Sequence, residues 1–173
     1  MLAWLAEQDD LTQAFTAGED VYKKMASRIY GVSEEDVTKE QRFVGKTTIL
    51  GAGYGMGAVK FQAQLKTFGF DIELAEARRV INIYREANWK INKLWRDAQH
   101  MLTGLSNREN IQFGLDGVIQ VVDGAMLLPS GLKLGYGDLQ FTQTDKGVEF
   151  DYKTRRGRTR IYGGKVIENV CQA

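Results

Sequence analysis

The chain has 173 residues, enough to bury a sizeable core in one domain, and with 43% hydrophobic and 26% charged residues its composition is typical of soluble globular proteins. A net charge of +1 excludes a strong overall field that would draw the whole chain to nucleic acid, and the single cysteine, Cys171, excludes an internal disulfide framework. No apolar run approaches the roughly 18 residues of a membrane span, and the first residues lack a signal-peptide pattern. We therefore expect a soluble, cytoplasmic protein with no membrane partner.

The first hundred residues predict helices. Two residue pairs, Ser33 with Asp36 and Thr38 with Gln41, match the capping-box pattern, in which a hydroxyl accepts a backbone N–H and an acid or amide three residues later bonds back. The second pair should start a helix over about residues 39–53. Three glycines then fall within five residues, and each disfavours a helix by about 1 kcal/mol relative to alanine, so the helix should end or bend there.

Two further helices are predicted before the texture of the chain changes. Residues 58–67 could form a short helix, followed by a turn at residues 68–70. Over residues 73–102 the apolar side chains recur with helical period, which predicts one long amphipathic helix whose aromatic residues pack in the core.

From residue 111 onward β-rich segments alternate with turn signals, before residues 165–173 return to helix. The expected strands lie within residues 117–122, 125–128, 132–134 and 149–152. Turn signals separate the first three at Asp123-Gly124 and at Pro129-Ser-Gly131. This order predicts an α+β fold, with an all-helical region over residues 1–105 and a mixed region over residues 106–173.

The predicted helix over residues 39–53 carries four side chains of very different chemistry at steps of four. Each step turns the helix face by only about 40° and advances about 6 Å. Arg42, Lys46 and Leu50 should therefore form one stripe, with Tyr54 next in line. Two fixed cations suit a polyphosphate, and the apolar and aromatic groups beyond them suit the faces of bases. The stripe predicts a nucleoside triphosphate lying along a helix.

The spacing Arg-x3-Lys-x7-Tyr-Gly resembles the nucleotide-binding helix in the fingers of family A DNA polymerases, the bacterial DNA polymerase I type and its phage relatives. Three other segments resemble the same family: residues 20–26 before that helix, residues 2–6 after the first catalytic aspartate motif, and residues 162–169 in a palm helix of phage-type members. The resemblance implies that residues 1–105 are a fingers region and that residues 106–173 are part of a palm, with β-hairpins and a C-terminal helix.

The resemblance also implies a function, template-directed DNA synthesis by nucleotidyl transfer from a dNTP to a primer 3′-hydroxyl. Arg42 and Lys46 would bind the triphosphate. Leu50 would contact the base and sugar, where many relatives carry Phe or Tyr. Tyr54 would stack at the templating position, and Gly55 would let DNA approach the backbone closely.

Family members hold Mg²⁺ with carboxylates, and this chain lacks the motifs that supply them. One aspartate would precede Leu2, and the other, in a His-Asp-Glu motif, would follow Ala173; the only histidine, His100, is not followed by Asp-Glu. We expect no catalytic or metal-binding residue in this chain and no activity from it alone. Its expected partners are primer–template DNA, dNTP and the remainder of a polymerase chain, in the cytosol of a bacterium or a phage-infected host.

A basic run near the end of the chain packs five cations into residues 153–160. Such a run can contact phosphates without a high overall charge. We expect DNA contacts from four of these cations, Arg155, Arg156, Arg158 and Arg160. A solvated hairpin or linker is the alternative interpretation of the same residues.

Three other interpretations remain open. Gly45, Lys46 and Thr47 suggest a phosphate-binding P-loop, but Glu40 stands where its first glycine should be. Residues 53–58 match a loose dinucleotide-binding fingerprint of an oxidoreductase, which requires a strand immediately before it. The chain could also be a nucleic-acid-binding module without chemistry.

Overall fold

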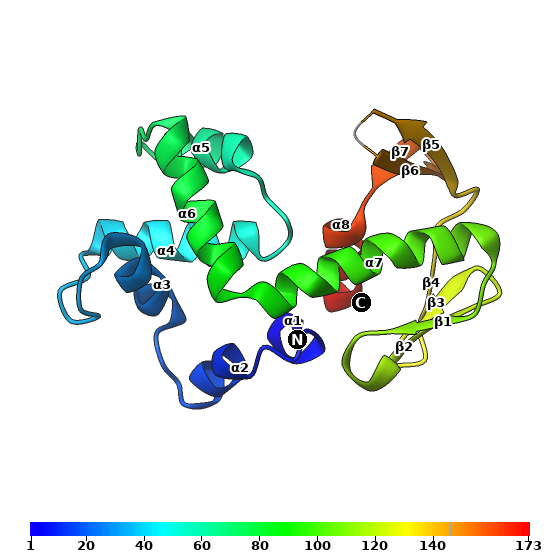
Figure 1. The fold of residues 1–173 in the computed structure, drawn as a ribbon, viewed down its shortest axis with the longest axis horizontal. Coiled ribbons are helices and arrows are strands. Elements are labelled where there is room, and N and C mark those ends of the chain that lie inside the picture. The colour runs from blue at the N-terminus through cyan, green and yellow to red at the C-terminus, as the bar shows by residue number, and fades with distance from the viewer. Residues whose placement is uncertain (146) are drawn as a thin grey trace. The chain divides into compact units, whose positions relative to one another are not determined.

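The computed structural model describes residues 1–145 and 147–173, which form an α+β fold (Figure 1). The helices are α1 (Leu2–Leu5), α2 (Asp9–Thr16), α3 (Val21–Tyr30), α4 (Lys39–Ala52), α5 (Ala58–Thr67), α6 (Leu74–Ala87), α7 (Trp89–Asn107) and α8 (Gly163–Gln172), with a 3-10 turn over Leu115–Gly117. The strands are β1 (Ile111–Phe113), β2 (Ile119–Val122), β3 (Ala125–Leu127), β4 (Lys133–Gly135), β5 (Gln140–Thr144), β6 (Gly147–Thr154) and β7 (Gly157–Ile161). No helix in the described ranges is long and apolar enough to span a membrane.

The chain divides into two compact units, one over residues 7–92 and one formed by residues 1–6 and 93–173. The division falls in the first turn of α7, upstream of the point near residue 107 where helices give way to strands. Each unit has its own core, and each is described below by itself.

The unit over residues 7–92 is built around the contacts of α3, α4, α5 and α6 (Figure 1). Its core consists of aliphatic and aromatic side chains from these four helices, among them Ile29, Val44, Phe61, Ile81 and Tyr84. The predicted capping box starts α4: Thr38 Oγ1 accepts from the Gln41 N–H at 3.2 Å, and Gln41 Oε1 accepts from the Thr38 N–H at 2.9 Å. The helix ends at Ala52 with Gly53 as its C-cap, as its cluster of glycines predicted.

Helices α3 and α4 pack closely at Gly45, which has no side chain to keep them apart. A Cβ atom at this position would clash with the backbone oxygen of Tyr22 and would lie 3.2 Å from the Cβ of Ala26. Gly45 is buried, so the cost of a glycine inside a helix is offset by close packing of the two helices.

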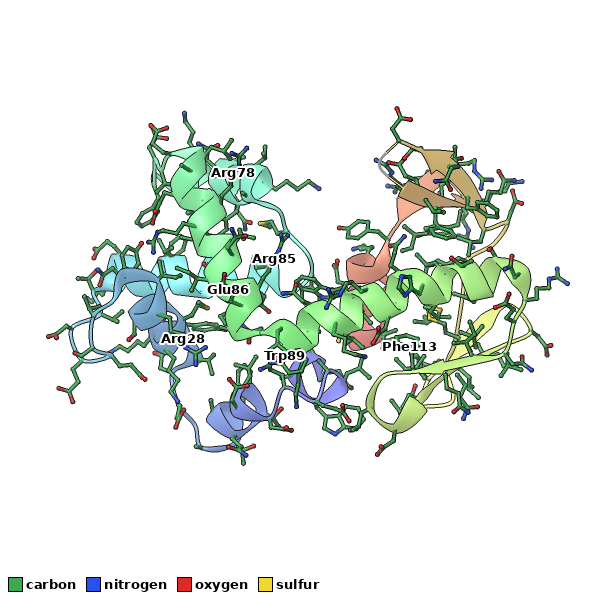
Figure 2. The ribbon with its side chains drawn as sticks, in the orientation of Figure 1. Arg28, Arg78, Arg85, Glu86, Trp89 and Phe113 are labelled. Carbon is green, nitrogen blue, oxygen red and sulfur yellow. The ribbon has the colours of Figure 1, made fainter. Side chains whose placement is uncertain are left out.

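The predicted helix over residues 73–102 is wrong, because the chain breaks between α6 and α7 at Asn88. This buried residue leaves helical geometry (φ −117°, ψ 51°), and its side-chain amide donates to the Tyr84 oxygen at 3.0 Å. Asparagine side chains offer the backbone such an alternative to a continuous helix. Asn92 then donates to the Arg85 oxygen at 2.7 Å, satisfying a carbonyl at the end of α6. Figure 2 marks this junction by Arg85 and Glu86 on one side and Trp89 on the other.

The capping-box pattern at Ser33 lies at a turn and not at the start of a helix. Ser33 Oγ does accept from the Asp36 N–H at 3.2 Å, but it closes a turn over residues 34–36. The next helix begins only after Thr38 supplies the second capping residue. Residues 58–67 and 68–70 form the predicted short helix and turn, with Gly69 at φ +85°.

The second unit contains two antiparallel sheets in simple sequential order, β1-β2-β3-β4 and β5-β6-β7. Asp123 and Gly124 join β2 to β3 with positive φ at both positions (54° and 74°), as a type I′ hairpin turn requires. The predicted strands coincide with β2, β3, β4 and β6, whereas β1, β5 and β7 were not individually predicted. Helix α8 begins at Gly163, where a Cβ would clash with the Trp95 oxygen of α7, and the Gly163 N–H bonds Gln99 Oε1 at 2.8 Å.

The two glycines at positions 45 and 51 of α4 give a matched test of this packing. We expect Gly45→Ala to lower the free energy of unfolding by about 1–3 kcal/mol, because the new methyl group must push α3 and α4 apart. In Gly51→Ala the methyl group meets only the flexible end of Met56, at 2.9 Å from its sulfur. That variant should stay within about 1 kcal/mol of the wild type. Urea denaturation measures both, and a more stable Gly45→Ala protein would contradict the close contact.

Candidate functional site

Helix α4 exposes the predicted stripe and buries the opposite face. Lys46 is exposed, Leu50 is 51% exposed, and the Arg42 side chain is 41% exposed. Val44 and Thr48 on the other side are buried, and Thr48 satisfies its hydroxyl by donating to the Val44 oxygen at 2.8 Å. The helical spacing therefore leaves two cations and one apolar side chain on a single accessible surface.

Tyr54 and Gly55 lie in the turn that follows α4, not in the helix. The Tyr54 N–H bonds the Gly51 oxygen at 3.2 Å, and the Gly55 N–H bonds the Ala52 oxygen at 3.0 Å. Gly55 has φ +84°, a conformation that favours glycine. Tyr54 is half-buried near Tyr84, whose phenol pKa is raised by burial and further by the proximity of Tyr54.

Arg42 is held by a residue from the start of α3. Its Nε–H donates to Asp20 Oδ2 at 2.7 Å, while Asp20 Oδ1 accepts the backbone N–H groups of Tyr22 and Lys23, both at 3.1 Å. Burial raises the pKa of Asp20, but the bond from Arg42 and the two backbone bonds outweigh it, and the pKa of Asp20 is lowered. The carboxylate therefore stays ionised and serves the helix cap and the guanidinium together.

The aromatic ring of Tyr22 completes the surroundings of Arg42, with its centroid 5.3 Å from the guanidinium carbon, within the range of a cation–π contact. Neither Asp20 nor Tyr22 was predicted as a site residue. A signal existed in the position of Asp20 just before a helix, where aspartate is a preferred N-cap. Its second oxygen finds Arg42, 22 residues away, only once the helices pack.

A cluster of three phenylalanines fixes another side of α4. The ring of Phe43 stacks on Phe70 at 5.2 Å and meets Phe68 edge-on at 5.1 Å. Phe68 and Phe70 both belong to the turn between α5 and α6. Helix α4 is therefore packed against this turn as well as against α3. These contacts favour a rigid placement of the exposed stripe.

The four arginines of the basic run lie in the hairpin of β6 and β7, in two different environments. Arg158 bonds Asp138 Oδ2 at 2.7 Å and pairs with Asp151, and Arg160 pairs with Glu149. The bond from Arg158 lowers the pKa of Asp138.

Arg155 and Arg156 occupy the turn at the tip of the hairpin and are exposed. No ion pair involves either of them within residues 1–145 and 147–173. Thr154 orders this turn, because its hydroxyl donates to the Gly157 oxygen at 2.7 Å and accepts the Arg156 N–H at 3.2 Å. The tip therefore presents two uncompensated cations on a defined backbone.

No three side chains of the types His, Cys, Asp or Glu converge within the part of the chain that the structure describes. The carboxylates of Asp138 and Asp151 are both engaged by Arg158.

The structure rejects both glycine-motif alternatives. Gly45, Lys46 and Thr47 lie inside α4, so they form no P-loop. The segment before Gly53 is the same helix and not the strand that a dinucleotide fingerprint requires. The described strands, moreover, pair only antiparallel, without a βαβ unit.

Comparison with known proteins agrees with this α+β fold. The model of DNA polymerase family A matches residues 1–107, which include all of α4. The chain belongs to DNA polymerase family A.

Individual relatives match to different extents. A DNA polymerase of Bacillus phage SP02 is 28% identical over 187 aligned residues, covering 100% of this chain and 28% of the relative. DNA polymerase I of Geobacillus stearothermophilus is 45% identical over 56 residues, covering 32% of this chain and 6% of the relative. The chain thus spans 28% of the length of the phage polymerase.

A solved structure is also similar. The POL domain of Pol1 from M. smegmatis, in complex with DNA primer-template and dNTP, matches with a TM-score of 0.50 and 28% identity. The match covers 62% of this chain and 18% of that chain.

Proposed function

We propose that this chain binds the incoming dNTP and the templating base in template-directed DNA synthesis by a family A DNA polymerase. The observation that carries the proposal is the exposed stripe of Arg42, Lys46 and Leu50 on α4, with Tyr54 in the turn beyond it. Membership of the family supports it, as does the similarity to a polymerase domain in complex with primer-template and dNTP.

In this proposal Arg42 and Lys46 bind the triphosphate. The primer 3′-hydroxyl attacks the α-phosphate, and pyrophosphate leaves. Negative charge moves toward the leaving group during this displacement, so fixed cations on that side stabilise the transition state more than the ground state. The guanidinium offers a planar fork for phosphate oxygens, and the ammonium offers a compact charge.

The remaining residues of the stripe serve the base and the template. Leu50 offers an apolar contact to the base and sugar but no aromatic face. Tyr54 stacks at the templating position, and the positive φ of Gly55 and the absence of a side chain there let DNA approach the backbone. At the hairpin of β6 and β7, Arg155 and Arg156 contact DNA phosphates, with Arg158 and Arg160 in a lesser role because carboxylates already neutralise them.

The magnesium ions of DNA synthesis would be held by the remainder of a polymerase chain. No group of three or more His, Cys, Asp or Glu side chains that could hold a metal ion occurs among the described residues. The 173-residue chain would therefore bind nucleotide and template without carrying out the reaction. We propose that the complete enzyme works in the cytosol of a bacterium or a phage-infected host.

Arg42→Ala and Lys46→Ala test the nucleotide site in the polymerase that contains this chain. We expect each change to lower kcat/KM for dNTP by about tenfold or more, equivalent to about 1.4 kcal/mol, because the substitution removes a cation that binds phosphate. Affinity for primer–template should be nearly unchanged. Steady-state kinetics and a DNA-binding titration measure the two quantities. If DNA affinity falls and nucleotide use does not, the assigned roles are wrong.

The hairpin arginines offer a paired comparison. Replacing Arg155 and Arg156 by Gln should flatten the dependence of log K for DNA on log salt by about 0.9 for each phosphate that is no longer neutralised. Replacing Arg158 and Arg160, which removes the same charge, should flatten it less, because both already pair with carboxylates. An unchanged slope in the first variant would mean that Arg155 and Arg156 do not contact DNA phosphates.

The 173-residue chain should not extend a primer in the presence of Mg²⁺ and all four nucleotides. Cations on α4 position a triphosphate, but they do not replace carboxylates that hold the metal ions between the attacking and leaving oxygens. A gel-based extension assay with purified chain tests this. Template-dependent extension that disappears in Lys46→Ala, which excludes a contaminating polymerase, would show that the catalytic centre is present after all.

A further inference from the structure

We propose that Asp20 is a positioning residue for the nucleotide, which holds the Nε–H of Arg42 so that the terminal nitrogens of the guanidinium meet the triphosphate in a fixed orientation. This inference rests on the proposed function of Arg42. It assigns a role to the N-cap residue of α3, which need not touch the nucleotide itself.

The carboxylate of Asp20 is itself immobilised. One oxygen accepts two backbone N–H groups at the start of α3, each at 3.1 Å, and the other accepts Arg42 Nε at 2.7 Å. Because Gly45 lets α3 and α4 pack without a side chain between them, the two ends of this bond come from tightly joined helices. The anchor is therefore set by the packing of the unit and not by a flexible surface contact.

The bond uses only one corner of the guanidinium. No hydrogen bond from the two terminal nitrogens of Arg42 occurs among residues 1–145 and 147–173. These nitrogens carry four of the five N–H donors of the group and suit two phosphate oxygens at once. The side chain is 41% exposed, so a ligand can reach it.

Holding Arg42 in the free protein favours binding through entropy. A free arginine side chain samples many rotamers, and fixing the side chain beforehand leaves less conformational entropy to lose when the nucleotide binds. The ring of Tyr22, 5.3 Å from the guanidinium carbon, further limits the orientations of the group.

For the effect of removing Asp20 on triphosphate affinity, simple electrostatics and a positioning role predict opposite directions. Removing a carboxylate beside a cation should strengthen binding of an anion, because the cation is then less neutralised. If Asp20 positions Arg42, its removal should weaken binding of a triphosphate.

Asp20→Asn separates the two tasks of the side chain. Asparagine is as good an N-cap as aspartate, so α3 keeps its cap, but the amide presents either an N–H or a neutral oxygen to Arg42. Asp20→Ser also keeps a capping oxygen and is too short to reach Arg42. The matched control is Glu76→Gln, which removes the same charge from the same unit at the ion pair of Glu76 with Arg79.

The experiment titrates the 173-residue chain with sodium triphosphate and with dATP, with backbone amides of α4 followed by NMR. We expect Asp20→Asn and Asp20→Ser to weaken binding of both ligands by about fivefold or more, with no change or slight tightening in Glu76→Gln. The Arg42 Nε–H resonance, identified by its loss in Arg42→Ala, should shift in both Asp20 variants. In the background of Arg42→Ala, Asp20→Asn should have no further effect, because Asp20 acts through Arg42.

The possible failures are distinguishable. If Arg42→Ala weakens binding but Asp20→Asn leaves it unchanged or tightens it, Asp20 either competes with the phosphate for Arg42 or only caps the helix. The role of Asp20 is then overturned, while the proposed nucleotide site stands. The inference is also overturned if the double variant loses affinity by the product of the factors seen in Arg42→Ala and Asp20→Asn, because Asp20 would then act independently of Arg42. If the wild type shows no saturable binding, or if neither Arg42→Ala nor Lys46→Ala alters it, the proposed nucleotide site and this inference fall together.

Discussion

The close contact between α3 and α4 at Gly45 is the constraint on which the candidate site depends. A glycine inside a helix is unfavourable by about 1 kcal/mol relative to alanine, and any larger residue would have to displace the backbone at Tyr22. That contact brings the first turn of α3 beside Arg42, so a cap residue of one helix can hold a cation of the other. The stripe on α4 is thus accessible to solvent, and its residue Arg42 is anchored by Asp20.

Those parts of the fold that depend on local signals could be predicted from the sequence. The capping box at Thr38 fixes the start of α4 through bonds between residues three apart, and the Asp-Gly pair at 123 and 124 fixes a hairpin through its positive φ angles. The break at Asn88 could not be predicted from periodicity, because the apolar pattern continues across it. The bond that ends α6 there uses a single side chain, and asparagine also occurs within helices.

The strands β5 and β7 escaped prediction for a different reason. Their side chains are mostly polar and exposed, so they lack the alternation of apolar and polar residues by which a half-buried strand is recognised. They are strands because β6 lies between them and pairs with both. The site shows the same division: the Arg42–Lys46 spacing is visible within one helix, whereas the bond from Asp20 spans 22 residues and exists only after helix packing.

The arginines of the basic run look equivalent in the sequence, but strand geometry gives carboxylate partners to some of them and not to others. Arg158 and Arg160 are two residues apart on β7, so both project from one face of the sheet, where Asp151 and Glu149 of β6 also project. Arg155 and Arg156 lie in the turn, beyond the last paired residues, where no strand places a carboxylate opposite them. Five cations in residues 153–160, less the carboxylates of Asp138, Glu149 and Asp151, leave a net charge of +2. Because carboxylates neutralise the paired arginines, this positive charge is concentrated toward the tip. The strand register therefore determines which arginines of the run remain available to a phosphate.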